Sequence, residues 1–352
     1  MKFDFRGKKI TGVLSVLPEN EYFFEEETAD PNNTKNRRLK KIIGYGKRRR
    51  VKRDTVMSDM FIYGIQHLLD TGKLSKSDIG AVVVVTLSPD YWLPQISSIV
   101  QGELHLSHDV YCVDIPSACA GFVVGLINSF MILDHMEDKK VVLCTGEIFN
   151  KKTEENEVKF EAPSFGGDIA NITVIENAEN EEKIPCSIFN DGENRNALRI
   201  HDGCFKNPMT QEKIAIQRAK IPHMLVDMDG SMVFNFVQRE VPPAVQDVVK
   251  RAGHTMEEID YFLFHQPNKF MLQKLAEQLG VPYSKVPMEL TAELGNSDSG
   301  TIPAVITTYK SEELLKEKKL CCLSGFGGGL TWASAVMNIG PLDFCENLDS
   351  KF

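Results

Sequence analysis

The amino-acid sequence predicts an α/β fold that is built by internal duplication. Two apolar runs, residues 81–86 and 261–265, have the composition of strands buried in a sheet, because such strands read as continuous apolar stretches. Each run is followed by a helix-like stretch and then by a turn of small residues that begins another helical pattern. Since these features occur in the same order in both halves, we expect one α/β unit that occurs twice.

Three further segments of the two halves correspond. In the first half a small-residue turn, a short strand and a glycine-containing segment occupy residues 117–121, 140–144 and 164–170. Their counterparts in the second half are residues 295–299, 319–323 and 325–331. The acidic stretch 176–183 has the composition of a surface turn. We therefore predict an N-terminal half of residues 1–180 and a C-terminal half of residues 181–352.

Two polar segments interrupt the repeated pattern. Residues 19–53 are rich in charge, and the pattern predicts a partial helix over 35–43. Residues 190–222 are rich in Gly, Asn and charged side chains. Long surface segments of this kind often carry substrate contacts.

The composition excludes several classes of protein. Of the 352 residues, 42% are hydrophobic and 25% are charged, which is typical of a soluble globular protein. The formal net charge of −9 disfavours nucleic-acid binding. No apolar run approaches 18 residues and the N-terminus is charged, so we expect neither a membrane helix nor a signal peptide. Eight scattered cysteines without an export signal indicate a reducing, cytoplasmic location. No pair has C-x-x-C spacing, which argues against a zinc ribbon or a redox motif. We expect no metal and no cofactor.

Cys119 is the strongest candidate for a catalytic residue. It lies between an apolar strand-like run and a helix-like run, where free N–H groups and the helix dipole are expected to lower the thiol pKa. His265 and Asn296 lie far downstream, each in a turn punctuated by Pro or Gly. A lone cysteine is usually an inert core residue, and a lone His or Asn usually a capping residue. The three together favour a nucleophilic thiol with polar helpers.

Four motifs in the same order carry a resemblance to a known family. They are the nucleophile turn Asp114–Phe122, the segment His265–Asn268, the segment from Gly295 to Pro303, and the glycine-rich segment Gly325–Trp332. With them the chain resembles the β-ketoacyl-ACP synthase III family, within the thiolase-like superfamily. The resemblance implies an acyltransferase with a duplicated α-β-α-β-α five-layer fold, which acts as a homodimer.

The resemblance also implies a chemistry for these residues. The Cys119 thiolate attacks an acyl thioester, and the backbone N–H groups of Cys119 and Gly328 hold the oxyanion. His265 and Asn296 then donate hydrogen bonds to a malonyl-carrier thioester, which stabilises the enolate formed when carbon dioxide leaves. The side chains expected to contact substrate are Leu93, Phe122, Asn268 and Phe326.

The chain departs from the family pattern at three places. Arg38 and Ile42 replace the Trp and Arg that hold the adenine of coenzyme A, residues 166–170 read Gly-Gly-Asp-Ile-Ala, and Leu93 replaces a Phe of the acyl pocket. The first change favours acyl carrier protein over coenzyme A as the carrier of the thioester. A basic patch of Arg48, Arg49, Arg50 and Lys52 is a candidate contact for that acidic partner, although a solvated loop explains the run equally well.

Two alternative functions remain open at the level of sequence. One is acyl transfer to oxygen or nitrogen of a small acceptor, against which the intact Asn296 argues. The other is a catalytically silent, partner-binding homologue, against which the presence of Cys119, His265 and Asn296 together argues. For the dimer, the apolar run Val110–Ile115 suits a strand that is buried on all sides and pairs across the two-fold axis.

Overall fold

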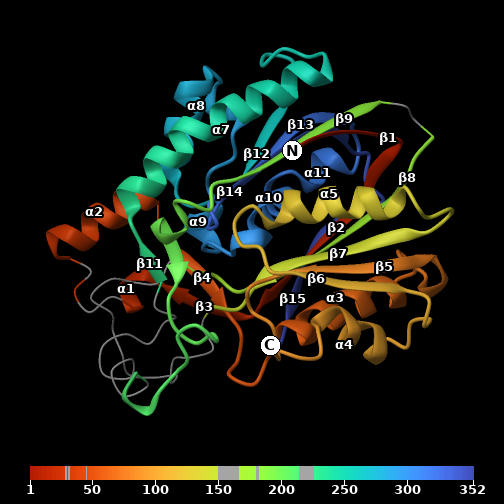
Figure 1. The fold of residues 1–352 in the computed structure, drawn as a ribbon, viewed down its shortest axis with the longest axis horizontal. Helices are drawn as coiled ribbons and strands as arrows, with labels where there is room; N and C mark the ends of the chain where they lie inside the picture. The colour runs from red at the N-terminus through yellow and green to blue at the C-terminus, as the bar shows by residue number, and fades with distance from the viewer. Residues whose placement is uncertain (28–29, 31, 45, 150–165, 180–181, 214–225) are drawn as a thin grey trace.

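Two β-sheets and three layers of helices form a five-layer α-β-α-β-α arrangement (Figure 1). The computed structural model describes residues 1–27, 30, 32–44, 46–149, 166–179, 182–213 and 226–352. The thiolase-like fold class predicted from the sequence is confirmed.

The larger sheet has six strands in the order β15-β2-β8-β7-β5-β6. Strand β5 pairs in parallel with both β6 and β7. Strand β8 pairs antiparallel with both β7 and β2. The strands are β2 (Lys8–Pro18), β5 (Ile79–Val85), β6 (Tyr111–Ile115), β7 (Lys140–Glu147), β8 (Ile169–Asn177) and β15 (Phe344–Ser350).

The smaller sheet has five strands in the order β1-β9-β14-β13-β12 and repeats this pattern. Its β12 and β13 are parallel, and β13 with β14 and β14 with β9 are antiparallel. The series β5-β7-β8-β2 therefore corresponds to β12-β13-β14-β9, as expected for a duplicated unit. The strands are β1 (Lys2–Arg6), β9 (Lys183–Asn190), β12 (Tyr261–Phe264), β13 (Lys319–Gly327) and β14 (Thr331–Ile339).

The helices pack in three layers around the sheets (Figure 1). One apolar core lies between the two sheets around α5 and α10, and a second and a third lie under the outer helix pairs. The helices are α5 (Gly121–Leu133) and α10 (Thr301–Tyr309) in the middle, α3 (Met57–Asp70) and α4 (Ile96–Glu103) on the larger sheet, and α7 (Gly230–Ala252) and α8 (Lys269–Leu279) on the smaller sheet. None of the described helices has the length and apolar character needed to span a bilayer.

The polar segment near the N-terminus folds into short elements beside these layers. The helix predicted over 35–43 is confirmed as α2 (Thr34–Ile43), which the Asn33 side chain caps and which ends at Gly44 in the left-handed conformation. The other elements are α1 (Phe24–Glu27) and the antiparallel pair β3 (Asn20–Phe23) and β4 (Lys47–Arg50). In the second polar segment β10 (Leu198–Ile200) pairs with β11 (Val226–Met228). Short helices α9 (Leu290–Glu293) and α11 (Ser311–Leu314) complete the C-terminal half.

The chain crosses from the larger to the smaller sheet between β8 and β9, within the acidic stretch predicted to join the halves. The terminal strands exchange places, because β1 pairs in the smaller sheet and β15 in the larger one. The division at residues 180 and 181 stays a prediction.

Within the single chain, strand β6 is not buried on all sides, because it forms the edge of the larger sheet and Tyr111 is 51% exposed. Burial of this strand by pairing across a two-fold axis stays a prediction.

Candidate active site

Cys119, His265 and Asn296 come from three separate turns at one end of the parallel strands. Cys119 follows β6 and precedes α5, and His265 follows β12. Asn296 precedes the 3-10 turn Asp298–Gly300, which leads directly into α10. The Cys119 sulfur, a ring nitrogen of His265 and a carboxylate oxygen of Asp298 lie within 4.8 Å of one another. The sequence prediction that these turns meet is consistent with this geometry.

The Cys119 sulfur lies against the glycine-rich end of β13. A Cβ atom on Gly327 would lie 2.6 Å from the sulfur, so only glycine leaves room for the thiol at this position. Cys119 itself is 9% exposed. The next glycine, Gly328, directs its backbone N–H to the sulfur, as does the N–H of Cys119. These are the two groups that the sequence predicted as an oxyanion hole.

The expectation of a lowered thiol pKa is wrong. Burial raises the pKa of Cys119 well above its usual value, and the neighbouring Asp298 carboxylate raises it further. The N–H groups of Gly328 and Cys119 lower the pKa of this thiol but do not offset burial. The thiol is therefore protonated at neutral pH, and its reaction requires a proton acceptor.

His265 is buried and neutral. Burial lowers the pKa of His265 to about 3. Its Nδ1 lies 2.8 Å from the Thr301 hydroxyl, and its ring packs edge-on against Phe326, with centroids 5.7 Å apart. A ring held from two sides presents its remaining nitrogen in a fixed direction.

Asn296 is held by backbone contacts and forms a tight turn with Asp298. Its Oδ1 accepts a hydrogen bond from the Asp298 N–H at 2.9 Å, and its carbonyl oxygen accepts one from Gly167 N–H at 2.9 Å. Asp298 has φ 45°, a left-handed conformation that Asp tolerates better than most residues. This turn directs the Asp298 carboxylate to Cys119, where the thiol donates a hydrogen bond to Oδ1 at 3.2 Å.

Asp298, which is partly buried, and Glu147, which is fully buried, are two neighbouring carboxyl groups that sequence reasoning missed. Burial raises the pKa of Asp298 to about 6. Burial also raises the pKa of Glu147, and the charge of Asp298 adds to this effect. The Glu147 carboxylate accepts hydrogen bonds from the Leu87 N–H and from the hydroxyls of Thr86 and Ser88. Asp298 could have been found in the sequence as the acidic residue inside the small-residue turn 295–299. Glu147 lies at the end of an apolar strand, which is a weaker indication of a functional carboxylate.

The four residues expected to contact substrate lie in different environments. Leu93 is 86% exposed, whereas Phe122 is buried in the core between the sheets. Asn268 caps α8 by accepting a hydrogen bond from the Met271 N–H at 2.8 Å. Phe326 is buried against His265. Their contact with substrate stays a prediction.

The basic run does not form one exposed patch. Arg48 is fully buried, and its guanidinium donates to the Gly166 carbonyl oxygen at 2.9 Å. Arg49 pairs with Glu21, Arg50 lies over the Tyr22 ring, and Lys52 pairs with Glu19. The prediction that Arg48 belongs to a carrier-protein patch is therefore wrong, because strand alternation turns its side chain inward.

The altered segment 166–170 has a structural role. The buried Asp168 carboxylate accepts hydrogen bonds from the N–H groups of Phe149, at 2.8 Å, and Val51, at 3.1 Å. It thus joins the segment after β7 to the segment after β4. Residues 164 and 165 of the predicted motif lie outside the described residues.

A sulfur, an imidazole nitrogen and a carboxylate oxygen are ligands that zinc accepts. Among the described residues, Cys119, His265 and Asp298 are the group whose ligand atoms lie this close together, but the Cys119 thiol donates its hydrogen to Asp298, whereas a metal ligand is a thiolate, so we do not assign these residues as metal ligands.

Comparison with known proteins identifies the family. Residues 249–339 match the family described as 3-Oxoacyl-[acyl-carrier-protein (ACP)] synthase III C terminal. The chain is 30% identical over 328 residues to the β-ketoacyl-[acyl-carrier-protein] synthase III of Latilactobacillus sakei, with 92% of this chain and 97% of the relative covered. A putative 3-oxoacyl-[acyl-carrier-protein] synthase 3 of Campylobacter jejuni is 27% identical, with 97% of each chain covered. The crystal structure of a 3-oxoacyl-(acyl-carrier protein) synthase from Burkholderia xenovorans superimposes with a TM-score of 0.89 at 28% identity over 99% of each chain. With the two-sheet duplicated fold and the Cys, His and Asn turns in place, this similarity shows that the chain belongs to the β-ketoacyl-[acyl-carrier-protein] synthase III family.

Proposed function

We propose that the protein is an acyltransferase that loads an acyl group onto Cys119 and then condenses it with a malonyl-carrier thioester. The observation that carries the proposal is the convergence of Cys119 and His265 with the Asn296–Asp298 turn. The names of the relatives support the same reaction class.

In the loading step the Cys119 sulfur attacks the thioester carbonyl carbon. The N–H groups of Cys119 and Gly328 stabilise the oxyanion that forms, because both already direct their hydrogens to this place. The carrier thiol then leaves, and the acyl group remains on the sulfur.

In the condensation step His265 and Asn296 act as hydrogen-bond donors to the malonyl thioester oxygen. Asn296 uses Oδ1 for the Asp298 N–H, which leaves Nδ2 as its donor. The Thr301 hydroxyl has one hydrogen and two acceptors in reach, the Asp298 carbonyl oxygen at 3.0 Å and His265 Nδ1 at 2.8 Å. The proposal requires the hydroxyl to donate to Nδ1 rather than to the Asp298 carbonyl oxygen, because the neutral ring then carries its proton on Nε2 and can donate from there. The two donors stabilise the enolate that forms when carbon dioxide leaves. Its carbon attacks the acyl carbonyl carbon, the bond from that carbon to the Cys119 sulfur breaks, and the sulfur leaves as a thiolate that is reprotonated.

The direct test is intact-mass measurement after incubation with acyl thioesters. The wild type should gain the mass of one acyl group, on the peptide that contains Cys119, and should release a β-ketoacyl product and carbon dioxide when malonyl-carrier is added. Cys119→Ser is nearly isosteric and should fold normally but form no stable acyl adduct. An acyl adduct on another residue, or normal turnover by Cys119→Ser, would refute the assignment.

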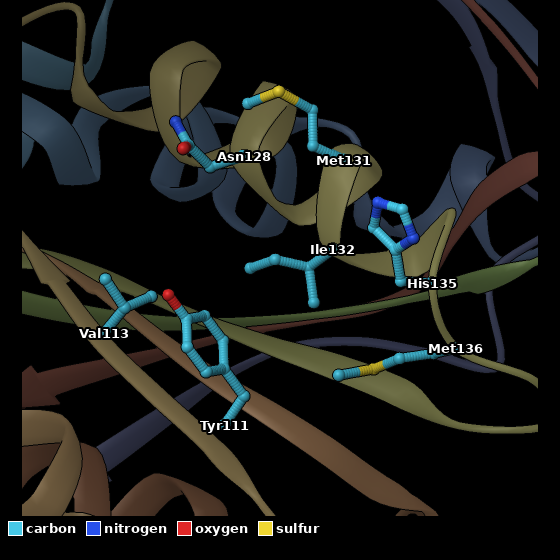
Figure 2. Close-up of a pocket in the computed structure, with 7 residues that line it drawn as sticks. All are labelled: Tyr111, Val113, Asn128, Met131, Ile132, His135 and Met136. Atoms are coloured by element: carbon cyan, nitrogen blue, oxygen red, sulfur yellow. The ribbon is translucent and has the colours of Figure 1, made fainter.

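We further propose that the protein works as a cytoplasmic homodimer. The outer edge of β6 pairs with no other described strand, and such an edge is a template for pairing with a second chain. Next to it a cavity of about 400 Å³ is lined by Tyr111 and Val113 from β6 and by apolar side chains of α5, including Met131 and Ile132 (Figure 2). The exposed Leu93 and Trp92 add apolar surface to the same half of the chain. Light scattering at micromolar concentration should give about twice the chain mass of 39.5 kDa, and a fully active monomer would refute the dimer.

A further inference from the structure

We propose that Asp298 is the catalytic base that takes the proton from the Cys119 thiol during acyl loading. This inference rests on the proposed function and assigns a further catalytic residue to it. The thiol donates to Asp298 Oδ1 across 3.2 Å, so the acceptor of the proton already touches the nucleophile.

The local backbone holds Asp298 in this position. Its N–H is bound by Asn296 Oδ1, and its φ of 45° turns the chain so that the carboxylate meets the sulfur. The next residue, Ser299, anchors the turn by donating to the Val85 carbonyl oxygen at 3.0 Å and accepting from the Gly146 N–H at 3.0 Å. Asn296 and Asp298 thus lie in one turn with two roles. The Asn296 amide acts in the condensation step, and the Asp298 carboxylate acts in the loading step.

The other titratable groups of the site are poorer acceptors. Those that face Asp298 among the described residues are Cys119, His265 and Glu147. The His265 ring has a pKa of about 3, whereas that of Asp298 is about 6, and a base is most effective when its pKa lies near the working pH. Glu147 already accepts hydrogen bonds from Thr86, Leu87 and Ser88, and burial together with the charge of Asp298 raises its pKa, so Glu147 keeps its own proton while Asp298 is ionised.

The proton balance of the step is complete. The S–H bond of Cys119 breaks as the sulfur forms its bond to the thioester carbonyl carbon, and the proton passes to Asp298 Oδ1. When the tetrahedral intermediate collapses, the bond from carbon to the carrier sulfur breaks, and the leaving sulfur takes the proton back from Asp298. Asp298 is then ionised again, and no other reactant is needed.

Two measurements on Asp298→Asn distinguish this role from a structural one. Single-turnover loading of Cys119, followed by intact mass, should slow by about 100-fold or more, because the amide accepts no proton. The apparent pKa of the Cys119 thiol, from the pH dependence of iodoacetamide alkylation of its peptide, should fall, because a negative charge next to the sulfur is removed. The peptide readout is needed since Cys204 is exposed and also reacts. Asp134→Asn makes the same change at the far end of α5, where the side chain is half exposed, and should alter neither value.

The wild-type pH profile tests the proposal without any variant. Asp298 is ionised above its pKa, so the loading rate should rise through about pH 6 and then level off below pH 9. A loading rate that keeps rising with pH as the thiol ionises would overturn the proposal. An Asp298→Asn variant that loads Cys119 as fast as the wild type does would also overturn it. A joint fall of loading and alkylation in Asp298→Asn would also overturn it, since that pattern indicates a side chain that only positions the sulfur. Failure of the wild type to load any thioester would instead contradict the proposed function, whereas the shift in thiol pKa is measured independently of it.

Discussion

The side-chain oxygen of Asn296 lies 2.9 Å from the Asp298 backbone nitrogen and accepts its hydrogen. This contact fixes the amide orientation, since an amide whose oxygen is held by a backbone donor offers its nitrogen to other partners. A single short turn therefore supplies both a hydrogen-bond donor and, two residues later, a carboxylate next to Cys119.

Asn296→Ala and His265→Ala should separate the two half-reactions. Each removes a donor to the enolate oxygen, which does not exist during loading, so decarboxylation and condensation should fall by about 100- to 1000-fold. Loading of Cys119 should change much less, and less in His265→Ala than in Asn296→Ala, because the latter also removes the acceptor of the Asp298 N–H. Carbon dioxide release measures the first effect and intact mass the second. Equal losses in both half-reactions would show that these residues activate the thiol instead.

The sequence allowed the prediction of the nucleophile turn, because Cys119 lies between two strong apolar patterns. His265 and Asn296 were predictable for the same reason, as each follows or begins a regular element. The thiol pKa was not predictable, because it depends on burial and on Asp298, which is 179 residues away in the sequence. The burial of Arg48 was not predictable either, because its partner, the Gly166 carbonyl oxygen, is 118 residues away.

Gly327→Ala should impair the site more than the fold. The added methyl would lie 2.6 Å from both the sulfur and the Cβ of Cys119, so the nucleophile must move away from its N–H donors. We expect loss of loading by at least about tenfold, because small displacements of reacting groups are costly. Gly102→Ala is the matched control, since no atom lies within 4 Å of its added methyl on α4. It should retain full activity and gain about 1 kcal/mol of stability as a better helix residue. A fully active Gly327→Ala would show that the sulfur tolerates displacement.

Arg48→Met should destabilise the protein. It keeps much of the side-chain volume but removes the buried donor to Gly166, and hydrogen bonds from charged groups contribute about 1.5–3 kcal/mol. Arg48 also lies beside Gly295, next to Asn296, so condensation should fall as well. Urea unfolding measures the loss, and Arg53→Met, at an exposed position of the same basic run, should leave stability within about 0.5 kcal/mol. Equal stability of the two variants would indicate that the buried guanidinium contributes nothing net.

The choice of thioester carrier should depend on α2. Arg38 and Ile42 are one helical turn apart on its exposed side, and α2 packs against α8, which Asn268 caps. The resemblance assigns an aromatic ring and a guanidinium to these two positions, where they hold adenine. Stacking and cation–π contacts of this kind contribute about 0.5–2 kcal/mol each. The wild type should therefore load from acyl carrier protein faster than from coenzyme A with the same acyl group.

The paired change Arg38→Trp with Ile42→Arg should restore the missing contacts. We expect binding of coenzyme A donors to improve by about ten- to a hundredfold, at 1.4 kcal/mol per factor of ten, with loading from the carrier protein unchanged. Arg37→Trp places the same ring on a neighbouring exposed position of α2 that points in another direction, and should give no gain. The measurement is the rate at which Cys119 is loaded, followed by intact mass, with the same acyl group on coenzyme A and on the carrier protein. A wild type that uses coenzyme A donors as well as the carrier protein would contradict the prediction, because adenine would then be held without these two side chains.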